Sequence, residues 1–77
     1  MIKAFVLISL QECDERNFLY ELKKNKEVKH AYVLFGEWDI LAEIEMENAE
    51  GLGTFIMDHI RSQECVKLTS SLIVAAQ

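Results

Sequence analysis

The sequence predicts an α+β fold of the ferredoxin-like type, a four-stranded antiparallel sheet with two helices on one of its faces. Three observations lead to this fold class. Strand-like and helix-like segments follow one another in the order βαββαβ, and no proline or linker-like stretch interrupts the 77 residues. The hydrophobic fraction of 51% is enough for one small core, whereas the length is too short for two. We therefore expect residues 1–77 to form a single domain.

The first half of the chain is expected to form a strand, a helix and a second strand. Residues 3–10 are almost continuously apolar, which is typical of a central strand that is covered on both faces. Asp14 and Glu15 mark the start of a helix of about three turns, because carboxylates stabilise a helix N-terminus, and a cluster of lysines marks its end. Residues 28–35 are again apolar on both faces, and this second strand is expected to stop at Gly36.

The second half is expected to form a strand, a helix and a long final strand. Apolar and polar side chains alternate in residues 38–46, so this segment is expected to form a hairpin with the preceding strand through the turn 36–37. Asn48 is a suitable N-cap for the second helix, and Gly53 is expected to let that helix approach the sheet closely. The buried stripe of this helix is predicted to comprise Leu52, Phe55, Ile56 and Ile60. Residues 66–76 are predicted to form the last strand.

One face of the predicted sheet has no cover. Right-handed crossovers put both helices on the same side, yet the first, second and last strands are apolar on both faces. The uncovered side is then a contiguous apolar patch, larger than a soluble monomer usually exposes. We therefore expect a homodimer closed by sheet-on-sheet packing, of the dimeric α+β barrel type. The long last strand is also placed to pair with the partner subunit.

The balance of charges excludes two classes of partner. Thirteen acidic against eight basic residues give a net charge of -5 and a pI near 4.9. The long-range field therefore repels nucleic-acid phosphates and anionic lipid. The apolar run 4–8 is far too short to span a bilayer, and residues 1–10 carry no signal-peptide cleavage pattern. We expect a cytoplasmic protein without direct nucleic-acid or membrane contacts.

Cysteines and histidines give no sign of a metal or catalytic site. Cys13 and Cys65 match neither a redox motif nor a zinc spacing, so we interpret them as buried or half-buried free thiols in a reducing compartment. Cys13 lies at a helix N-terminus, where the dipole is expected to lower its pKa. His30 and His59 have no further ligands at a suitable spacing and are interpreted as surface or interface residues. No phosphate-binding or nucleophile motif occurs, so no metal, cofactor or catalytic residue is predicted.

The segment Gly36-Glu37-Trp38-Asp39 is the strongest candidate for a binding site. A glycine at a hairpin tip lets the backbone approach a ligand, while the adjacent aromatic ring supplies a wall and the acid an ammonium partner. The alternative is an ordinary hairpin turn in which Glu37 is solvated, Trp38 packs in the core and Asp39 caps the turn.

A second candidate is the hydroxyl cluster of the last strand. Thr69 and Ser71 share one face of that strand, so both hydroxyls can donate to one carboxylate. Hydroxyl pairing across a sheet explains the two residues equally well.

Four segments of the chain together resemble a known module: residues 3–8, residues 28–33, the stretch AYVLFGEWDILAEI and residues 66–74. In order and spacing they are similar to the effector-binding domain of the Lrp/AsnC family, also called RAM for regulation of amino-acid metabolism. The resemblance covers essentially the whole chain. In that family the module normally follows a DNA-binding helix-turn-helix, and we expect this chain to lack that half.

The resemblance implies a ferredoxin-like fold that dimerises through its sheets, with dimers assembling into rings such as octamers and a small effector, usually an amino acid, bound between dimers. Gly36 and Asp39 match the family's glycine-x-aromatic-aspartate turn, where backbone and carboxylate hold the effector's amino group. Trp38 takes the aromatic position, which is often tyrosine in the family. Thr69 and Ser71 match a hydroxyl pair from a neighbouring subunit that binds the effector's carboxylate.

Three functional hypotheses follow. The leading one is a stand-alone amino-acid-sensing and assembly module, not an enzyme, that modulates full-length Lrp/AsnC regulators by co-assembly. A rival is a small enzyme of the dimeric α+β barrel type, similar to cofactor-free monooxygenases, with Asp39 or a histidine as its base. The third is a purely structural oligomerising module whose interdimer cleft is plugged by Trp38.

Overall fold

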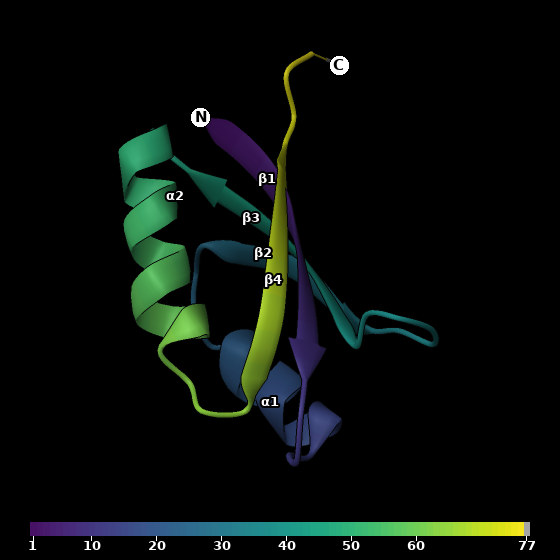
Figure 1. The fold of residues 1–77 in the computed structure, drawn as a ribbon. Helices are drawn as coiled ribbons and strands as arrows, with labels where there is room; N and C mark the ends of the chain where they lie inside the picture. Colours follow the sequence, from purple (N-terminus) through teal and green to yellow (C-terminus); the bar gives the residue numbers. More distant parts are fainter. Residues whose placement is uncertain (77) are drawn as a thin grey trace.

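One antiparallel sheet and two helices make up the computed structural model, which describes residues 1–76. The elements are β1 (Ile2–Leu10), α1 (Glu15–Leu22), β2 (Val28–Val33), β3 (Ile40–Met46), α2 (Ala49–Ile56), a π-helical turn η1 (Met57–Arg61) and β4 (Val66–Ile73). The strand order is β2-β3-β1-β4, and both helices lie on the same side of the sheet (Figure 1). The predicted ferredoxin-like α+β fold is confirmed.

The register of the strands decides which side chains share a face. β1 is central, as predicted, and Ile8 is paired with Ile40 of β3 on one side and with Thr69 of β4 on the other. Directly paired residues point to the same face, and alternate residues along a strand point to opposite faces. Each strand therefore contributes one set of side chains to the helix-covered face and the other set to the bare face.

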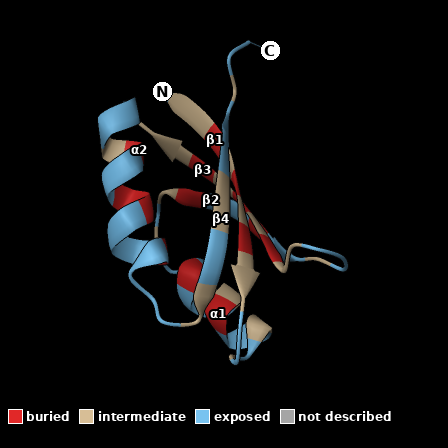
Figure 2. Ribbon diagram, in the orientation of Figure 1, coloured by how far each residue is buried: buried red, intermediate tan, exposed pale blue. Residues whose placement is uncertain are grey.

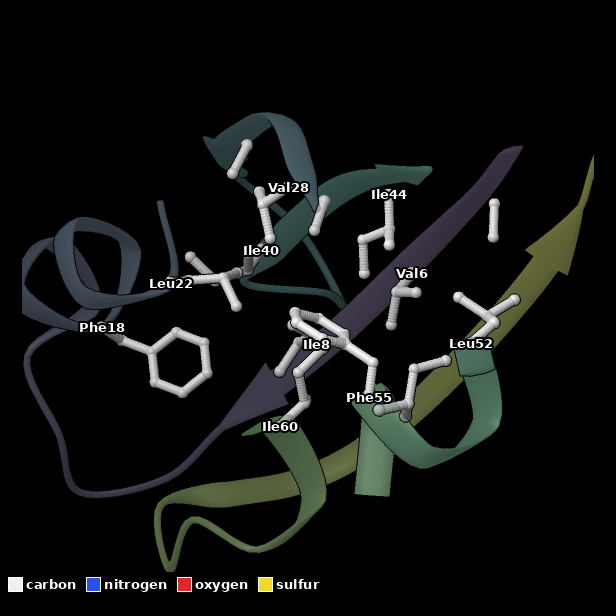
Figure 3. Packing of buried hydrophobic residues seen from close by; sticks show 14 residues of the cluster. Val6, Ile8, Phe18, Leu22, Val28, Ile40, Ile44, Leu52, Phe55 and Ile60 are labelled. Carbon is white, nitrogen blue, oxygen red and sulfur yellow. The ribbon is translucent and has the colours of Figure 1, made fainter. Parts of the chain in front are cut away.

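The hydrophobic core fills the space between the sheet and the helices (Figure 2). The alternate residues Ala4, Val6 and Ile8 of β1 are completely buried there. Figure 3 shows Leu22 of α1 beside Ile40 of the sheet. The predicted stripe of α2 is confirmed, since all four of its members are buried: Leu52, Phe55, Ile56 and Ile60.

Helix α1 begins as predicted but is shorter than predicted. Its N-cap is Asp14, whose Oδ1 accepts from the backbone N–H groups of Arg16 at 2.9 Å and Asn17 at 3.3 Å. The helix has eight residues, about two turns, and the lysines lie beyond its end. It stops because the N–H of Asn25 donates to the carbonyl of Leu22, a tight i to i+3 bond, and the Asn25 side chain donates to the same oxygen at 3.0 Å.

Helix α2 begins at the predicted cap, where Asn48 Oδ1 accepts from the N–H of Gly51 at 2.7 Å. The expectation for Gly53 is wrong. This residue is exposed, and a Cβ placed on it would meet no atom within 4 Å. Close packing against the sheet therefore comes from the apolar stripe on the opposite side of the helix.

The two strands of the hairpin, β2 and β3, and the last strand, β4, are shorter than predicted. β2 ends at Val33 and β3 begins at Ile40, so residues 34–39 form a six-residue loop instead of a two-residue turn. The predicted antiparallel hairpin itself is confirmed. β4 ends at Ile73, although the N–H of Val74 still donates to the carbonyl of Lys3 at 2.9 Å.

The face of the sheet away from the helices carries large apolar side chains without a cover. Tyr32, Leu68 and Leu72 are more than half exposed on this face, around the half-buried Phe5 and Leu7. We call these five residues the bare-face patch. At its edge Lys3 Nζ and Glu43 Oε2 lie 3.8 Å apart. None of the helices within residues 1–76 is long and apolar enough to cross a membrane.

Candidate functional site

Three chain segments meet where β1 ends. β2 runs parallel to β1, and β3 and β4 run antiparallel to it, so this end of the sheet collects the β1–α1 connection, the β2–β3 loop and the start of β4. Two hydrogen bonds tie the segments together. The N–H of Gln11 donates to the carbonyl of Cys65 at 2.8 Å, and the N–H of Leu10 donates to Asp39 Oδ2 at 2.7 Å.

The loop 34–39 projects from this end of the sheet (Figure 1). Its base is closed by the N–H of Leu34, which donates to the carbonyl of Asp39 at 2.8 Å, and by the N–H of Asp39, which donates to the carbonyl of Ile8 at 2.9 Å. Gly36 has φ 129°, a conformation that side chains other than hydrogen disfavour. Glycine is thus needed at this position for the backbone path of the loop.

Asp39 has both a structural role and a free acceptor. Its Oδ2 holds the N–H of Leu10 at the end of β1, a group that would otherwise lack a partner in the sheet. This agrees in part with the alternative in which Asp39 stabilises a turn. No residue among 1–76 donates a hydrogen bond to the other carboxylate oxygen, Oδ1. That oxygen remains available to a ligand's donor.

A cavity of about 700 Å³ lies between the loop and the N-terminus of α1. Its volume is in the range of small-molecule sites. The wall is formed by Cys13, Asp14, Glu15 and Arg16 on one side and by Val33, Leu34, Phe35, Gly36 and Asp39 on the other. Three carboxylates against one guanidinium favour a ligand that carries a cationic group.

The structure brings together two of the six residues predicted for the site. Gly36 and Asp39 line the cavity, whereas Glu37 and Trp38 lie in the same loop but outside the lining. Glu37 is exposed and Trp38 is half-buried. In a single protomer neither side chain is therefore a wall of this cavity.

The other two predicted residues lie on β4, away from the cavity. Thr69 and Ser71 are paired with Ile8 and Val6, so they share the helix-side face of the strand, as predicted. Thr69 lines a separate hollow of about 280 Å³ together with Arg61 and Lys67. Within one protomer the structure does not join these hydroxyls to Asp39.

The thiols confirm one prediction and correct another. Cys13 and Cys65 are free and half-buried, as expected. Burial, together with hydrogen bonding and charge from the Cys65 side chain, raises the pKa of Cys13 to about 11. The predicted lowering by the helix dipole is therefore wrong, because desolvation and the second thiol outweigh the dipole.

The two histidines lie outside the cavity lining. His30 and His59 are both exposed, as expected, and the ring of His59 stacks on Phe55 with centroids 4.8 Å apart. Within residues 1–76 no group of three or more histidine, cysteine or acidic side chains is arranged to hold a metal ion.

Sequence reasoning missed the α1 side of the cavity. Asp14 and Glu15 were interpreted only as a helix start, and Arg16 was not considered. The topology contains the missing signal. In a βαββαβ sheet the β1–α1 connection and the β2–β3 loop emerge at the same end, so a candidate residue in one directs attention to the other.

The family model of the Lrp/AsnC ligand binding domain matches residues 3–77. An uncharacterised helix-turn-helix-type transcriptional regulator of Pyrococcus abyssi is 27% identical over 73 residues, which cover 91% of this chain and 49% of that protein. The chain therefore spans about half the length of this curated relative.

Two solved structures are similar to the fold. The crystal structure of FFRP-DM1 is 34% identical, has a TM-score of 0.90, and matches over 96% of this chain and 99% of its own. The complex of a Neisseria meningitidis transcriptional regulator with L-Met is 22% identical, has a TM-score of 0.84, and matches over 99% of this chain and 51% of its own. The second likeness concerns the fold alone.

Proposed function

Because the chain belongs to the Lrp/AsnC ligand-binding domain family, we propose that it is an amino-acid effector-binding and oligomerisation module, with residues 1–77 acting as one domain. The observation that carries this proposal is the cavity of about 700 Å³ beside the free oxygen of Asp39. The similar Neisseria regulator was crystallised with L-Met, which makes an amino acid the first ligand to test.

The effector's ammonium group would be bound by Asp39. In this proposal Asp39 Oδ1 accepts a hydrogen bond from the ammonium group. Gly36 has no side chain, so its backbone can also lie close to the ammonium group. The acidic lining adds to the attraction for a cation and makes the cavity unsuitable for a simple anion.

The effector's carboxylate needs donors from elsewhere. Thr69 and Ser71 of a neighbouring subunit are proposed for this role, which is consistent with their place on the edge strand β4, where Thr69 is half-buried and Ser71 exposed, and with their absence from the cavity lining in their own protomer. Glu37 and Trp38 are proposed to contact the effector or that neighbour, because they lie in the projecting loop. The complete site would then form only in the oligomer.

The oligomer is proposed to be a homodimer that assembles further into a ring such as an octamer. The bare-face patch supports dimerisation, since closing two such faces against each other removes Tyr32, Leu68 and Leu72 from water. At roughly 25 cal/mol per Å² such burial adds to the marginal net stability that a chain this short reaches by itself.

We further propose that the module modulates full-length Lrp/AsnC regulators by co-assembly, in the cytoplasm. The curated relative is named a transcriptional regulator, which favours regulation over the rival enzymatic role. Neither histidine lines the cavity, and Asp39, the other base considered for that role, is committed to Leu10 through one oxygen.

Thermal unfolding against the proteinogenic amino acids tests effector binding. A ligand that binds only the folded assembly stabilises it by RT ln(1 + [L]/Kd), about 2.7 kcal/mol at a hundredfold excess over Kd. We expect a selective rise in Tm that is lost in Asp39→Asn, a variant that keeps an acceptor for Leu10 but removes the charge. Glu47→Gln, an exposed residue after β3 at the other end of the sheet, should keep the rise.

A flat panel with an intact oligomer by light scattering would contradict effector binding and favour the purely structural module. Co-assembly has its own test in size-exclusion chromatography of a mixture with a full-length Lrp/AsnC regulator. Two unshifted peaks, with and without amino acids, would contradict it.

A further inference from the structure

The fold brings the two cysteines of the chain close together, although they are far apart in sequence. The main-chain bond from the Gln11 N–H to the Cys65 carbonyl, 2.8 Å long, continues the pairing of β1 and β4 past the end of the sheet. Glu12 then adopts a left-handed conformation with φ 54°, and Cys13 follows it directly. The Cys65 side chain is close enough to hydrogen bond to the Cys13 thiol.

We propose that Cys13 and Cys65 form a reversible intramolecular disulfide, a redox modification site that joins the start of α1 to the start of β4. The pair is half-buried, which leaves access for a small oxidant. The left-handed backbone at Glu12 is uncommon for a residue with a side chain, and it lies between the Gln11 hydrogen bond to Cys65 and Cys13 itself.

The oxidant is a hydroperoxide such as hydrogen peroxide. The thiolate of one cysteine attacks the peroxide, the O–O bond breaks, and a sulfenic acid and hydroxide form. The second thiol attacks the sulfenic sulfur, the S–S bond forms, and the sulfenic oxygen leaves as water with the thiol proton. Two thiols are thus oxidised by two electrons, one peroxide is reduced to two waters, and a dithiol reductant reverses the change.

The raised pKa of Cys13 sets the conditions for the reaction. At neutral pH this thiol stays protonated, so its thiolate, the form that attacks a peroxide, is scarce. The rate of oxidation should therefore rise steeply with pH. Cys13 also lines the cavity of Gly36 and Asp39, so the disulfide would fix one wall of that cavity. The disulfide itself does not depend on effector binding, and its test requires no effector.

The experiment treats the full chain at low concentration with a graded series of hydrogen peroxide, then blocks free thiols and measures intact mass. We expect loss of two hydrogen atoms, and trypsin should release peptide 4–16 joined to peptide 62–67. Dithiothreitol should restore both thiols. The closed loop is long, so the oxidised protein should unfold at a Tm higher by on the order of 10 °C.

Cys13→Ser and Cys65→Ser serve as matched controls, because each removes one sulfur and changes the volume little. Each variant should gain oxygen or form intermolecular dimers on a non-reducing gel, but should never lose two hydrogens as a monomer. The proposal is overturned if the unmodified chain behaves like these variants. It is also overturned if the cross-linked chain unfolds at a lower Tm than the reduced one, since the bond would then form only in a distorted fold.

Discussion

The two faces of the sheet are built from alternate residues of the same strands, yet they meet different surroundings. On the helix-covered face, residues such as Val6 and Ile44 have no exposed surface. On the bare face, Tyr32 and Leu72 are apolar but more than half exposed. The covered face is complete within one protomer, whereas the bare face leaves large side chains such as Leu72 uncovered beside charged ones such as Lys3 and Glu43. Uncovered apolar surface of this kind supports the proposed packing of two such faces against each other.

Removing volume from the covered face should have the largest effect. Ile44→Ala leaves a cavity among fully buried side chains and is expected to reduce the free energy of unfolding by about 2–5 kcal/mol. Urea unfolding at one protein concentration measures the change. Thr54→Ala, on the exposed side of α2, should stay within about 0.5 kcal/mol of the starting protein. An equal effect of the two variants would mean that this face is no packed core.

A charge on the bare face should weaken self-association rather than folding. Leu72 and Ile73 are neighbours on β4 with almost equal exposure, 56% and 53%, but they point to opposite faces. Leu72→Asp is expected to raise the dimer dissociation constant at least about tenfold, which corresponds to 1.4 kcal/mol. Ile73→Asp should leave it nearly unchanged. Sedimentation equilibrium gives both constants, and identical behaviour of the two variants would argue against sheet-on-sheet packing.

Replacing a glycine by alanine should change the free energy of unfolding in opposite directions in the projecting loop and in helix α2. Gly36→Ala forces a side chain onto φ 129° and is expected to cost about 1–3 kcal/mol in unfolding free energy, even though space is open. Gly53→Ala lies in the interior of α2, also in open space, and is expected to stabilise by about 0.5–1 kcal/mol. Thermal unfolding compares the two variants directly. Destabilisation by Gly53→Ala would mean that the helix surface there is covered in the assembly.

The smallest effect on stability at neutral pH should come from the Cys13 thiol, whose contribution changes only at alkaline pH. Its pKa is raised from 9.0 to about 11 in the folded state, mainly by burial, so the unfolded chain loses this proton first. The stabilisation is complete below pH 9 and is lost as the pH rises toward 11, because the folded state then binds more protons than the unfolded state. Unfolding midpoints of the starting protein should fall more steeply over this range than those of Cys13→Ser. Parallel pH profiles would show that the thiol is not buried as described.

Much of the fold was predictable from local patterns. The alternation of Ile40, Ala42 and Ile44 identified the buried side of β3, and Asn48 identified the start of α2. These features depend on neighbouring residues in sequence, where periodicity and capping chemistry act directly. The end of α1 was less predictable, because the side-chain bond from Asn25 to the Leu22 carbonyl competes with continuation of the helix.

The candidate site was predictable only in part. Gly36 and Asp39 were identified from the hairpin motif, and both line the cavity. The loop length was wrong, since it depends on the bond from Asp39 to the distant Ile8 and not on turn chemistry alone. The roles proposed for Thr69 and Ser71 require a neighbouring subunit, and sequence spacing within one chain says nothing about that distance.

Periodicity, capping and composition were therefore sufficient for the order of elements, the covered face and the apolar character of the bare face, because each depends on residues close together in the chain. The tertiary structure alone decided that α1 forms a wall of the cavity, that Asp39 holds the end of β1, and that Cys13 meets Cys65. These contacts join segments that are distant in sequence. Their geometry follows from the register of the sheet and from the left-handed backbone at Glu12, and both arise only when the whole core packs.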